Sequence, residues 1–155
     1  MRKEFDYYIY IDYSENLIGY AIIEKSKIKE LLPKINRFRH YRKARDKRLY
    51  LKNVKNTFKR EKLLNYFLKT KVRGMWQNLD IFSEVIEFLK NNSNCIIFIS
   101  VDDKQYSSFE KLVKVIDIGN TKIINESELR KGTFEYQISL VLDNWINIER
   151  LKNED

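Results

Sequence analysis

The sequence predicts an α/β domain with a mixed sheet and flanking helices, and three observations support that prediction. Residues 7–11 and 95–99 are uninterrupted apolar runs with the length of strands that are buried on both faces. Strand-like runs alternate along the chain with segments whose apolar residues recur at helical spacing. The final segment, residues 134–151, fits a helix that is apolar on nearly all sides, which is typical of a buried helix.

The N-terminal region predicts a hairpin. Residues 7–12 form the first expected strand, turn-forming residues occupy 14–16, and residues 17–23 form the second strand. A short third strand is expected over residues 27–32, where Pro33 closes the section.

A helical pattern follows from about residue 35 to residue 70, as two helices or as one long broken helix. Gly74 marks a break, and the polar run at 91–94 stops the next helix. That helix opens at residue 75 or 76 and carries apolar side chains three and four residues apart, namely Trp76, Leu79, Phe82, Val85, Ile86 and Leu89.

The C-terminal half predicts two more strands and two helices. Residues 95–101 form a strand, and a short helix is expected around residues 107–112. Either residues 115–118 or residues 122–124 supply the next strand. Residues 134–151 form the last helix.

Length and composition indicate a folded domain. A chain of 155 residues with 43% apolar residues is most simply one domain, covering residues 1–155. The single cysteine, Cys95, excludes an internal disulfide and a cysteine-based zinc cluster. No stretch approaches the roughly 18–20 apolar residues that span a bilayer. The acids near the N-terminus do not fit a signal peptide, so we expect a cytoplasmic protein without membrane partners.

The charge is unevenly distributed. Residues 34–73 contain 16 of the 30 basic residues and only two acids, Asp46 and Glu61, which gives a local net charge of +14. The remaining 14 basic and 20 acidic residues give the rest of the chain a net charge of −6. Such a division predicts a polyanion-binding element attached to a mildly acidic body.

Three aspartates lie in apolar surroundings. Asp12 ends the first strand, Asp102 follows the strand at 95–101, and Asp143 lies inside the last helix. A carboxylate there is costly to desolvate unless it reaches solvent, a cation or a metal. Ordinary alternatives exist: a turn former for Asp12, a loop start or helix cap for Asp102, and a salt bridge or exposed edge for Asp143. The combination of the three aspartates predicts a divalent-cation site. If the strand continues, Asp103 points to the opposite face from Asp102 and therefore away from this site.

At these residues the chain resembles the ribonuclease H-like superfamily. Residues 9–14, Ile-Tyr-Ile-Asp-Tyr-Ser, with Gly-Tyr-Ala-Ile-Ile at 19–23, resemble its first hairpin, whose first strand delivers a catalytic aspartate. Residues 99–106, Ile-Ser-Val-Asp-Asp-Lys-Gln-Tyr, resemble its fourth strand and second aspartate. Residues 126–143, from Glu-Ser to Leu-Val-Leu-Asp, resemble uncharacterised members with an Asp-Glu-Ser-Gly-like first strand and a Leu-Gln-Leu-Ala-Asp-like C-terminal helix.

The resemblance covers about residues 6–32 and 76–150, and it implies an RNase H-like mixed sheet with flanking helices. A basic helical insertion at about 34–74 departs from the family pattern. The resemblance also implies a fourth acid on the first long helix. Asp80, Glu84 and Glu87 are candidates, each with a solvated helix face as the alternative, and Asp80 suits a site at the strand ends because it lies near the start of its helix. The implied catalytic residues are therefore Asp12, Asp102, Asp143 and Asp80.

The chemistry of the cation site follows from its ligands. Carboxylates without histidine or cysteine form a hard oxygen site that suits Mg²⁺ or Mn²⁺, with Asp12, Asp102 and Asp143 as ligands. In the resembling family, two such ions support hydrolysis of a nucleic-acid strand.

The insertion mixes cations with aromatic residues. Cations neutralise phosphates, and Phe38, Tyr41 or Tyr50 would stack on unpaired bases; the alternative is a solvated helix face whose aromatic residues belong to the core. His40 would assist proton transfer or simply lie at the surface. The expected nucleic-acid-binding residues are Arg37, Arg39, His40, Tyr41, Arg42, Lys43, Arg45 and Arg48.

The leading hypothesis is a metal-dependent nuclease that acts on RNA, an RNA–DNA hybrid or branched DNA by a two-metal mechanism. A catalytically inactive RNase H-like module that binds nucleic acid is the alternative. A ribonucleoprotein or mobile-element subunit is a third possibility, and the sequence leaves a protein partner or a homodimer open.

Overall fold

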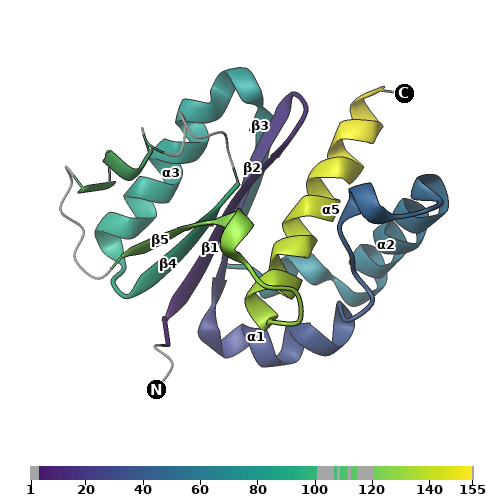
Figure 1. The fold of residues 1–155 in the computed structure, drawn as a ribbon, viewed down its shortest axis with the longest axis horizontal. Helices are drawn as coiled ribbons and strands as arrows, with labels where there is room; N and C mark the ends of the chain where they lie inside the picture. Colours follow the sequence, from purple (N-terminus) through teal and green to yellow (C-terminus); the bar gives the residue numbers. More distant parts are fainter. Residues whose placement is uncertain (1–3, 101–106, 108, 112, 115–120, 155) are drawn as a thin grey trace.

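A five-stranded mixed sheet with strand order β3-β2-β1-β4-β5 forms the centre of the molecule (Figure 1). The structure is a computed structural model that describes residues 4–100, 107, 109–111, 113–114 and 121–154. The expected α/β architecture, a mixed sheet with flanking helices, is confirmed.

The N-terminal hairpin is confirmed. β1 (Tyr7–Ser14) pairs antiparallel with β2 (Leu17–Glu24), in a register that sets Asp12 opposite Gly19. β4 (Cys95–Ile99) lies parallel to β1, and β5 (Lys122–Asn125) lies parallel to β4. The carboxyl ends of β1, β4 and β5 therefore share one edge of the sheet.

Both faces of the sheet are covered, as the uninterrupted apolar strands require. Alternate residues of β1 point to opposite faces: Tyr8 and Tyr10 belong to one core, and Ile9 and Ile11 belong to the other. The first core includes side chains of α1 (Lys25–Leu31), α2 (Lys47–Glu61) and α5 (Phe134–Glu154). The second core includes side chains of α3 (Asn78–Asn91), which lies across the sheet from α5 in Figure 1.

The expected strand at residues 27–32 is wrong, because this segment belongs to α1. Ile28 and Leu31 lie three residues apart and are both buried, so the apolar spacing is that of a helix. A 3₁₀ turn, η1 (Leu32–Lys34), follows and carries Pro33 in its first turn.

The segment expected to be helical up to residue 70 contains two helical elements and then a strand. α2 is followed by the 3₁₀ helix η3 (Leu63–Tyr66), and β3 (Lys69–Gly74) then pairs antiparallel with β2 at the edge of the sheet. β3 is rich in charged residues, so no apolar alternation revealed it. Backbone pairing with β2 determines its conformation.

The helix after Gly74 begins with the 3₁₀ turn η4 (Met75–Gln77) and continues as α3. Trp76 and Leu79 were expected on its buried stripe, but their side chains are 84% and 72% exposed. The remaining stripe residues pack against the sheet as expected; they are Phe82, Val85, Ile86 and Leu89.

The other C-terminal elements agree with expectation where they are described. Residues 107, 109–111 and 113–114 are helical, and β5 occupies the second of the two candidate strand segments. Residues 115–118, the first candidate, lie outside the described residues. α5 is the expected last helix. Within the described part of the chain, no helix has both the length and the apolar character needed to cross a membrane.

Candidate functional site

Asp12 lies at the carboxyl edge of the sheet, on the face that α5 covers. It follows Tyr8 and Tyr10 in the alternation of β1 and is 8% exposed. One of its carboxylate oxygens accepts a hydrogen bond of 2.8 Å from the backbone N–H of Tyr13. The sequence therefore places a buried carboxylate where β1 leaves the core.

The ends of β4 and β5 bring two more oxygen-bearing side chains to the same edge. Ser100 follows β4, and its backbone N–H donates to the carbonyl of Ile11 at 2.8 Å, directly before Asp12. Glu126 follows β5 and begins the 3₁₀ turn η5 (Glu126–Glu128). The side chain of Ser100 lowers the pKa of both Asp12 and Glu126, against the effect of burial.

Asp143 approaches this edge from α5 and is 5% exposed. The expected insertion, residues 34–74, contacts its two oxygens: Nε2 of His40 lies 3.4 Å from Oδ1, and the backbone N–H of Tyr41 donates to Oδ2 at 2.9 Å. Tyr41 begins a short 3₁₀ turn, η2 (Tyr41–Lys43). The insertion thus reaches the carboxylate edge of the sheet through residues 40 and 41.

Burial acts on all three carboxyl groups, and the charge of Asp143 acts on the other two. Burial, followed by the charges of Glu126 and Asp143, raises the pKa of Asp12 well above its usual value. Burial also raises the pKa of Glu126, with a further contribution from Asp143. For Asp143, burial raises the pKa although His40, the Tyr41 N–H and Arg42 act in the opposite direction. Repulsion and desolvation thus make it unfavourable for all three carboxyl groups to be ionised at the same time.

A polar network joins the hairpin, α5 and the insertion next to these carboxyl groups. Asn147 lies one turn after Asp143, accepts a hydrogen bond of 2.9 Å from the Ser14 hydroxyl and donates one of 2.8 Å to the Asp143 carbonyl. Arg150 donates to the Asn147 side chain at 3.1 Å, and its guanidinium group lies 5.8 Å from the ring centre of Tyr41. These contacts fix the position of α5 against the tip of the hairpin.

The structure brings two of the four expected catalytic residues together, Asp12 and Asp143. Asp102, the third, lies outside the described residues. Asp80 is exposed in the first turn of α3, which packs on the other face of the sheet. Of the other two candidates for a fourth acid, Glu84 pairs with Lys71 and Glu87 is exposed.

The eight expected nucleic-acid-binding residues fall into three groups. His40 and Tyr41 contact Asp143, while Arg37 and Arg39 line a pocket beside α2. The remainder have exposed side chains on or near η2 and at the start of α2; they are Arg42, Lys43, Arg45 and Arg48. Phe38 is a core residue whose ring lies 5.9 Å from that of Phe58, so the core alternative holds for this aromatic side chain.

The donor set fits a hard divalent cation in its chemistry. Asp12, Glu126 and Asp143 supply carboxylate oxygens, Ser100 adds a hydroxyl, and a cation among them would offset the repulsion that raises their pKa values. Among the described residues, however, no group of three or more Asp, Glu, His or Cys side chains is arranged closely enough to hold a metal ion. The oxygens of Asp143 are instead directed to His40 and Tyr41.

Sequence reasoning missed Glu126, Asn147 and Arg150. Asn147 and Arg150 follow Asp143 at spacings of four and seven residues, so a helical projection would have placed all three on one face of α5. Glu126 had a weaker signal: it directly follows β5, whose four residues include only two apolar ones. Its role depends on the parallel pairing of β5 with β4, which the sequence does not show.

Comparison with known proteins adds evidence for the fold. No protein-family model matches the chain, and no curated protein matches its sequence. The structure is similar to the crystal structure of the ribonuclease H2 from Pyrococcus horikoshii OT3, with a TM-score of 0.51 and 18% sequence identity. The match covers 95% of this chain and 76% of that chain. Together with the five-stranded mixed sheet, this similarity gives the chain a ribonuclease H-like fold.

Proposed function

We propose that this protein is a metal-dependent nuclease that hydrolyses phosphodiester bonds in RNA, an RNA–DNA hybrid or branched DNA. One observation supports the proposal: Asp12 and Glu126 come from the ends of parallel strands, Asp143 comes from the helix that covers them, and the charge of Asp143, together with burial, raises the pKa of both Asp12 and Glu126. Clusters of carboxyl groups with raised pKa values are typical of functional sites. The ribonuclease H-like fold supports the same proposal.

In this proposal, Asp12, Glu126 and Asp143 hold Mg²⁺ or Mn²⁺, with Asp102 as a further ligand by resemblance. The bound ions would activate water and stabilise the leaving oxygen of the phosphodiester. Ser100, at the end of β4, lowers the pKa of Asp12 and Glu126 and so favours the ionised carboxylates that a cation needs. Asn147 and Arg150 hold α5 against the hairpin, which keeps Asp143 at the edge of the sheet.

The insertion supports the choice of nucleic acid as the substrate. Residues 34–73 carry a net charge of +14 and contact the carboxylate edge directly through His40 and Tyr41. Exposed cations such as Arg42 and Arg45 would neutralise phosphates of a strand that reaches Asp143. The same residues make a phosphate-free substrate a poor match for this surface.

A second candidate function is a nucleic-acid-binding module without catalysis, alone or as a subunit of a ribonucleoprotein. Two observations favour it: Asp143 is engaged by His40 and Tyr41, and the described carboxylates are not arranged as a metal cluster. In this alternative the contacts of His40 and Tyr41 with Asp143 serve only to hold the structure together. The two candidates differ in whether a divalent cation binds and whether cleavage follows.

The deciding experiment is a cleavage assay with labelled single-stranded RNA, RNA–DNA hybrid, duplex DNA and a four-way junction, each with Mg²⁺, Mn²⁺ or EDTA. Asp12→Asn and Glu126→Gln remove one charge each from the site. Glu128→Gln is the matched control, since Glu128 is exposed in the same turn η5. The nuclease requires metal-dependent cleavage in the wild type and the control, and its loss in both site variants. Binding without cleavage on every substrate would favour the binding module.

A further inference from the structure

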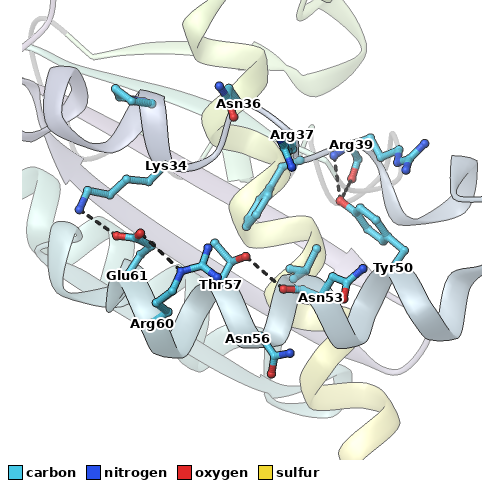
Figure 2. A pocket seen from close by; sticks show the side chains of 13 residues that line it. Lys34, Asn36, Arg37, Arg39, Tyr50, Asn53, Asn56, Thr57, Arg60 and Glu61 are labelled. Atoms are coloured by element: carbon cyan, nitrogen blue, oxygen red, sulfur yellow. Dashed lines mark hydrogen bonds and ion pairs between the residues drawn. The ribbon is translucent and has the colours of Figure 1, made fainter.

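A cationic pocket of about 580 Å³ lies between the loop after η1 and one face of α2, as Figure 2 shows. Its volume falls within the roughly 300–1,000 Å³ of small-ligand sites and leaves no room for a double helix. Arg37 and Arg39 come from the loop, and Arg60 comes from α2. The pocket is separate from the carboxylate edge, which Asp12, Glu126 and Asp143 form.

The charge of the pocket favours an anionic ligand. Glu61 is the one acid among the lining residues that the structure describes, and it already lies 3.1 Å from Lys34 and 3.6 Å from Arg60. Within the described part of the chain, Arg37 and Arg39 have no carboxylate partner. Two guanidinium groups thus remain available for a phosphate, which they can bind through paired hydrogen bonds.

The other walls of the pocket suit a nucleobase. Asn53 and Asn56 lie three residues apart on the exposed face of α2, and Asn36 comes from the loop (Figure 2). Carboxamides donate and accept hydrogen bonds together, as the edges of bases do. The guanidinium group of Arg39 lies 5.2 Å from the centre of the Tyr50 ring. These two planar groups offer a flat surface on which a base can stack.

The same loop connects the pocket with the carboxylate edge. Side chains of α5 bind its backbone, with Gln137 donating to the Phe38 carbonyl at 3.1 Å and Asn144 to the Arg39 carbonyl at 3.1 Å. Two residues further on, the Tyr41 N–H binds Asp143. Two residues of extended chain span at most about 7 Å, so a strand in the pocket lies within a few nucleotides of Asp143.

We propose that this pocket binds one unpaired nucleotide of a nucleic-acid strand, with Arg37 and Arg39 on its phosphate and the asparagine carboxamides on its base. The proposal rests on the proposed nucleic-acid substrate and adds to it a preference for single-stranded over duplex segments. A strand seated here would be aligned with the carboxylate edge before any cleavage. Binding at the pocket requires no metal, because arginines and amides supply the contacts.

The test is fluorescence anisotropy of a labelled twelve-nucleotide single-stranded RNA and of the same RNA in a hybrid duplex, both in EDTA so that metal-dependent cleavage is prevented. The proteins are the full chain, Arg37→Ala, Asn53→Ala and the control Lys90→Ala. All three positions are exposed, and Lys90 lies at the end of α3 on the other side of the sheet. Circular dichroism melting verifies that each variant is folded.

We expect Arg37→Ala to weaken single-strand binding about tenfold and to lower the slope of log K against log salt by about 0.7. Asn53→Ala should weaken it about threefold without changing the slope, since an amide carries no charge. The duplex should bind more weakly than the single strand and respond less to both changes. Lys90→Ala should leave single-strand affinity within twofold of the wild type.

Three results would overturn the proposal: equal affinities for Arg37→Ala and Lys90→Ala, equal losses on the duplex, or adenosine monophosphate binding as tightly as the RNA. The last result would assign the pocket to a free nucleotide. The outcome is independent of cleavage. Binding that depends on Arg37 in a chain that cuts nothing would keep the pocket and reject the nuclease, whereas cleavage without that dependence would do the reverse.

Discussion

The ionised form of Asp12 is electrostatically unfavourable in the candidate site, because burial and two neighbouring carboxyl groups raise its pKa well above the usual value. We expect Asp12→Asn to abolish cleavage and to stabilise the metal-free protein at pH 7. The amide keeps an oxygen for the Tyr13 N–H and removes the charge. The melting temperature in EDTA should rise by several degrees, at roughly 2–4 °C per kcal/mol for a chain of this size.

The sign of the pH dependence follows from the raised pKa. Ionisation of Asp12 disfavours the folded state, so its destabilising effect is complete above the folded pKa and disappears as pH falls toward 3.8, the ordinary value. The stability difference between Asp12→Asn and the wild type should therefore shrink on acidification. Melting curves between neutral and acidic pH measure this. A difference that is constant with pH, or a less stable variant at pH 7, would contradict the proposed repulsion.

Cys95 provides a second measurement at single-residue scale. Burial, with a smaller contribution from Asp6, raises the pKa of its thiol from 9.0 to about 11. The thiol is therefore protonated and shielded at pH 8, and we expect a disulfide reagent to label it slowly in the native state and at once in guanidinium. Because the unfolded thiol ionises first, stability should also fall as pH rises from 9.0 to about 11. Rapid native labelling would show that β4 opens readily.

Single residues show where sequence reasoning about the site succeeded and where it stopped. Asp12 and Asp143 were identifiable because a carboxylate in an apolar strand or helix is unusual in itself. Glu126 lies beside polar neighbours, and only the pairing of β5 with β4 brings it to the edge. Local chemistry is therefore readable from the sequence, whereas contacts between distant segments require the topology.

At the scale of elements, Gly19 allows α5 and β3 to approach β2 closely. A Cβ atom at this position would lie 2.9 Å from the Lys71 carbonyl oxygen and 3.3 Å from the Cδ1 atom of Ile146 on α5. Gly19 also lies opposite Asp12 in the hairpin, and Ile146 lies one turn after Asp143. The spacing between the two aspartates thus depends on the absence of a side chain here.

We expect Gly19→Ala to destabilise the fold by about 1–3 kcal/mol, because the added methyl group meets backbone that cannot move freely. Cleavage should fall even at temperatures where the variant is folded, since α5 carries Asp143 away from Asp12. Gly74→Ala is the matched control: the three atoms nearest to its Cβ belong to the side chain of Trp76, which is exposed and can turn away. Urea unfolding and the cleavage assay measure both. Equal stability of the two variants would reject this role for Gly19.

Elements with strong apolar signals were predictable, and elements that depend on neighbours were not. Apolar patterns in the sequence were sufficient to predict β1, β2, β4 and α5. β3 is a strand because β2 offers it a free edge, so its charged sequence carried no signal. α1 was mistaken for a strand because a segment of seven residues holds too few apolar positions to distinguish the two periods easily.

For the whole molecule, the division of charge is the dominant physical property. Residues 34–73 have a net charge of +14, while the rest of the chain has a net charge of −6. The helical part of this basic segment packs on the face of the sheet that α5 covers, and its last part, β3, forms the edge of the sheet. A polyanion approaching the protein is therefore attracted to the side that carries Asp143 and is repelled elsewhere. Binding and the proposed cleavage should consequently depend on different residues of the same face.

We expect a variant with Arg37, Arg39, Arg42 and Arg45 changed to Gln to bind RNA more weakly and with a flatter salt dependence. Each lost phosphate contact lowers the slope of log K against log salt by about 0.7, so four contacts would lower it by about 3. Asp12→Asn should keep the wild-type slope while losing cleavage, because it removes no cation. Titrations at several salt concentrations in EDTA measure the slopes.

The control for this variant changes the same net charge outside the insertion, at Lys90, Lys111, Lys114 and Lys131. If general electrostatic attraction governed binding, both quadruple variants would lose the same slope, since they lose the same charge. If the insertion makes the phosphate contacts, the control should keep most of its slope, because short-range contacts release counterions and distant charges are screened beyond about 8 Å at physiological salt. Equal slopes in the two variants would thus reject the insertion as the nucleic-acid interface.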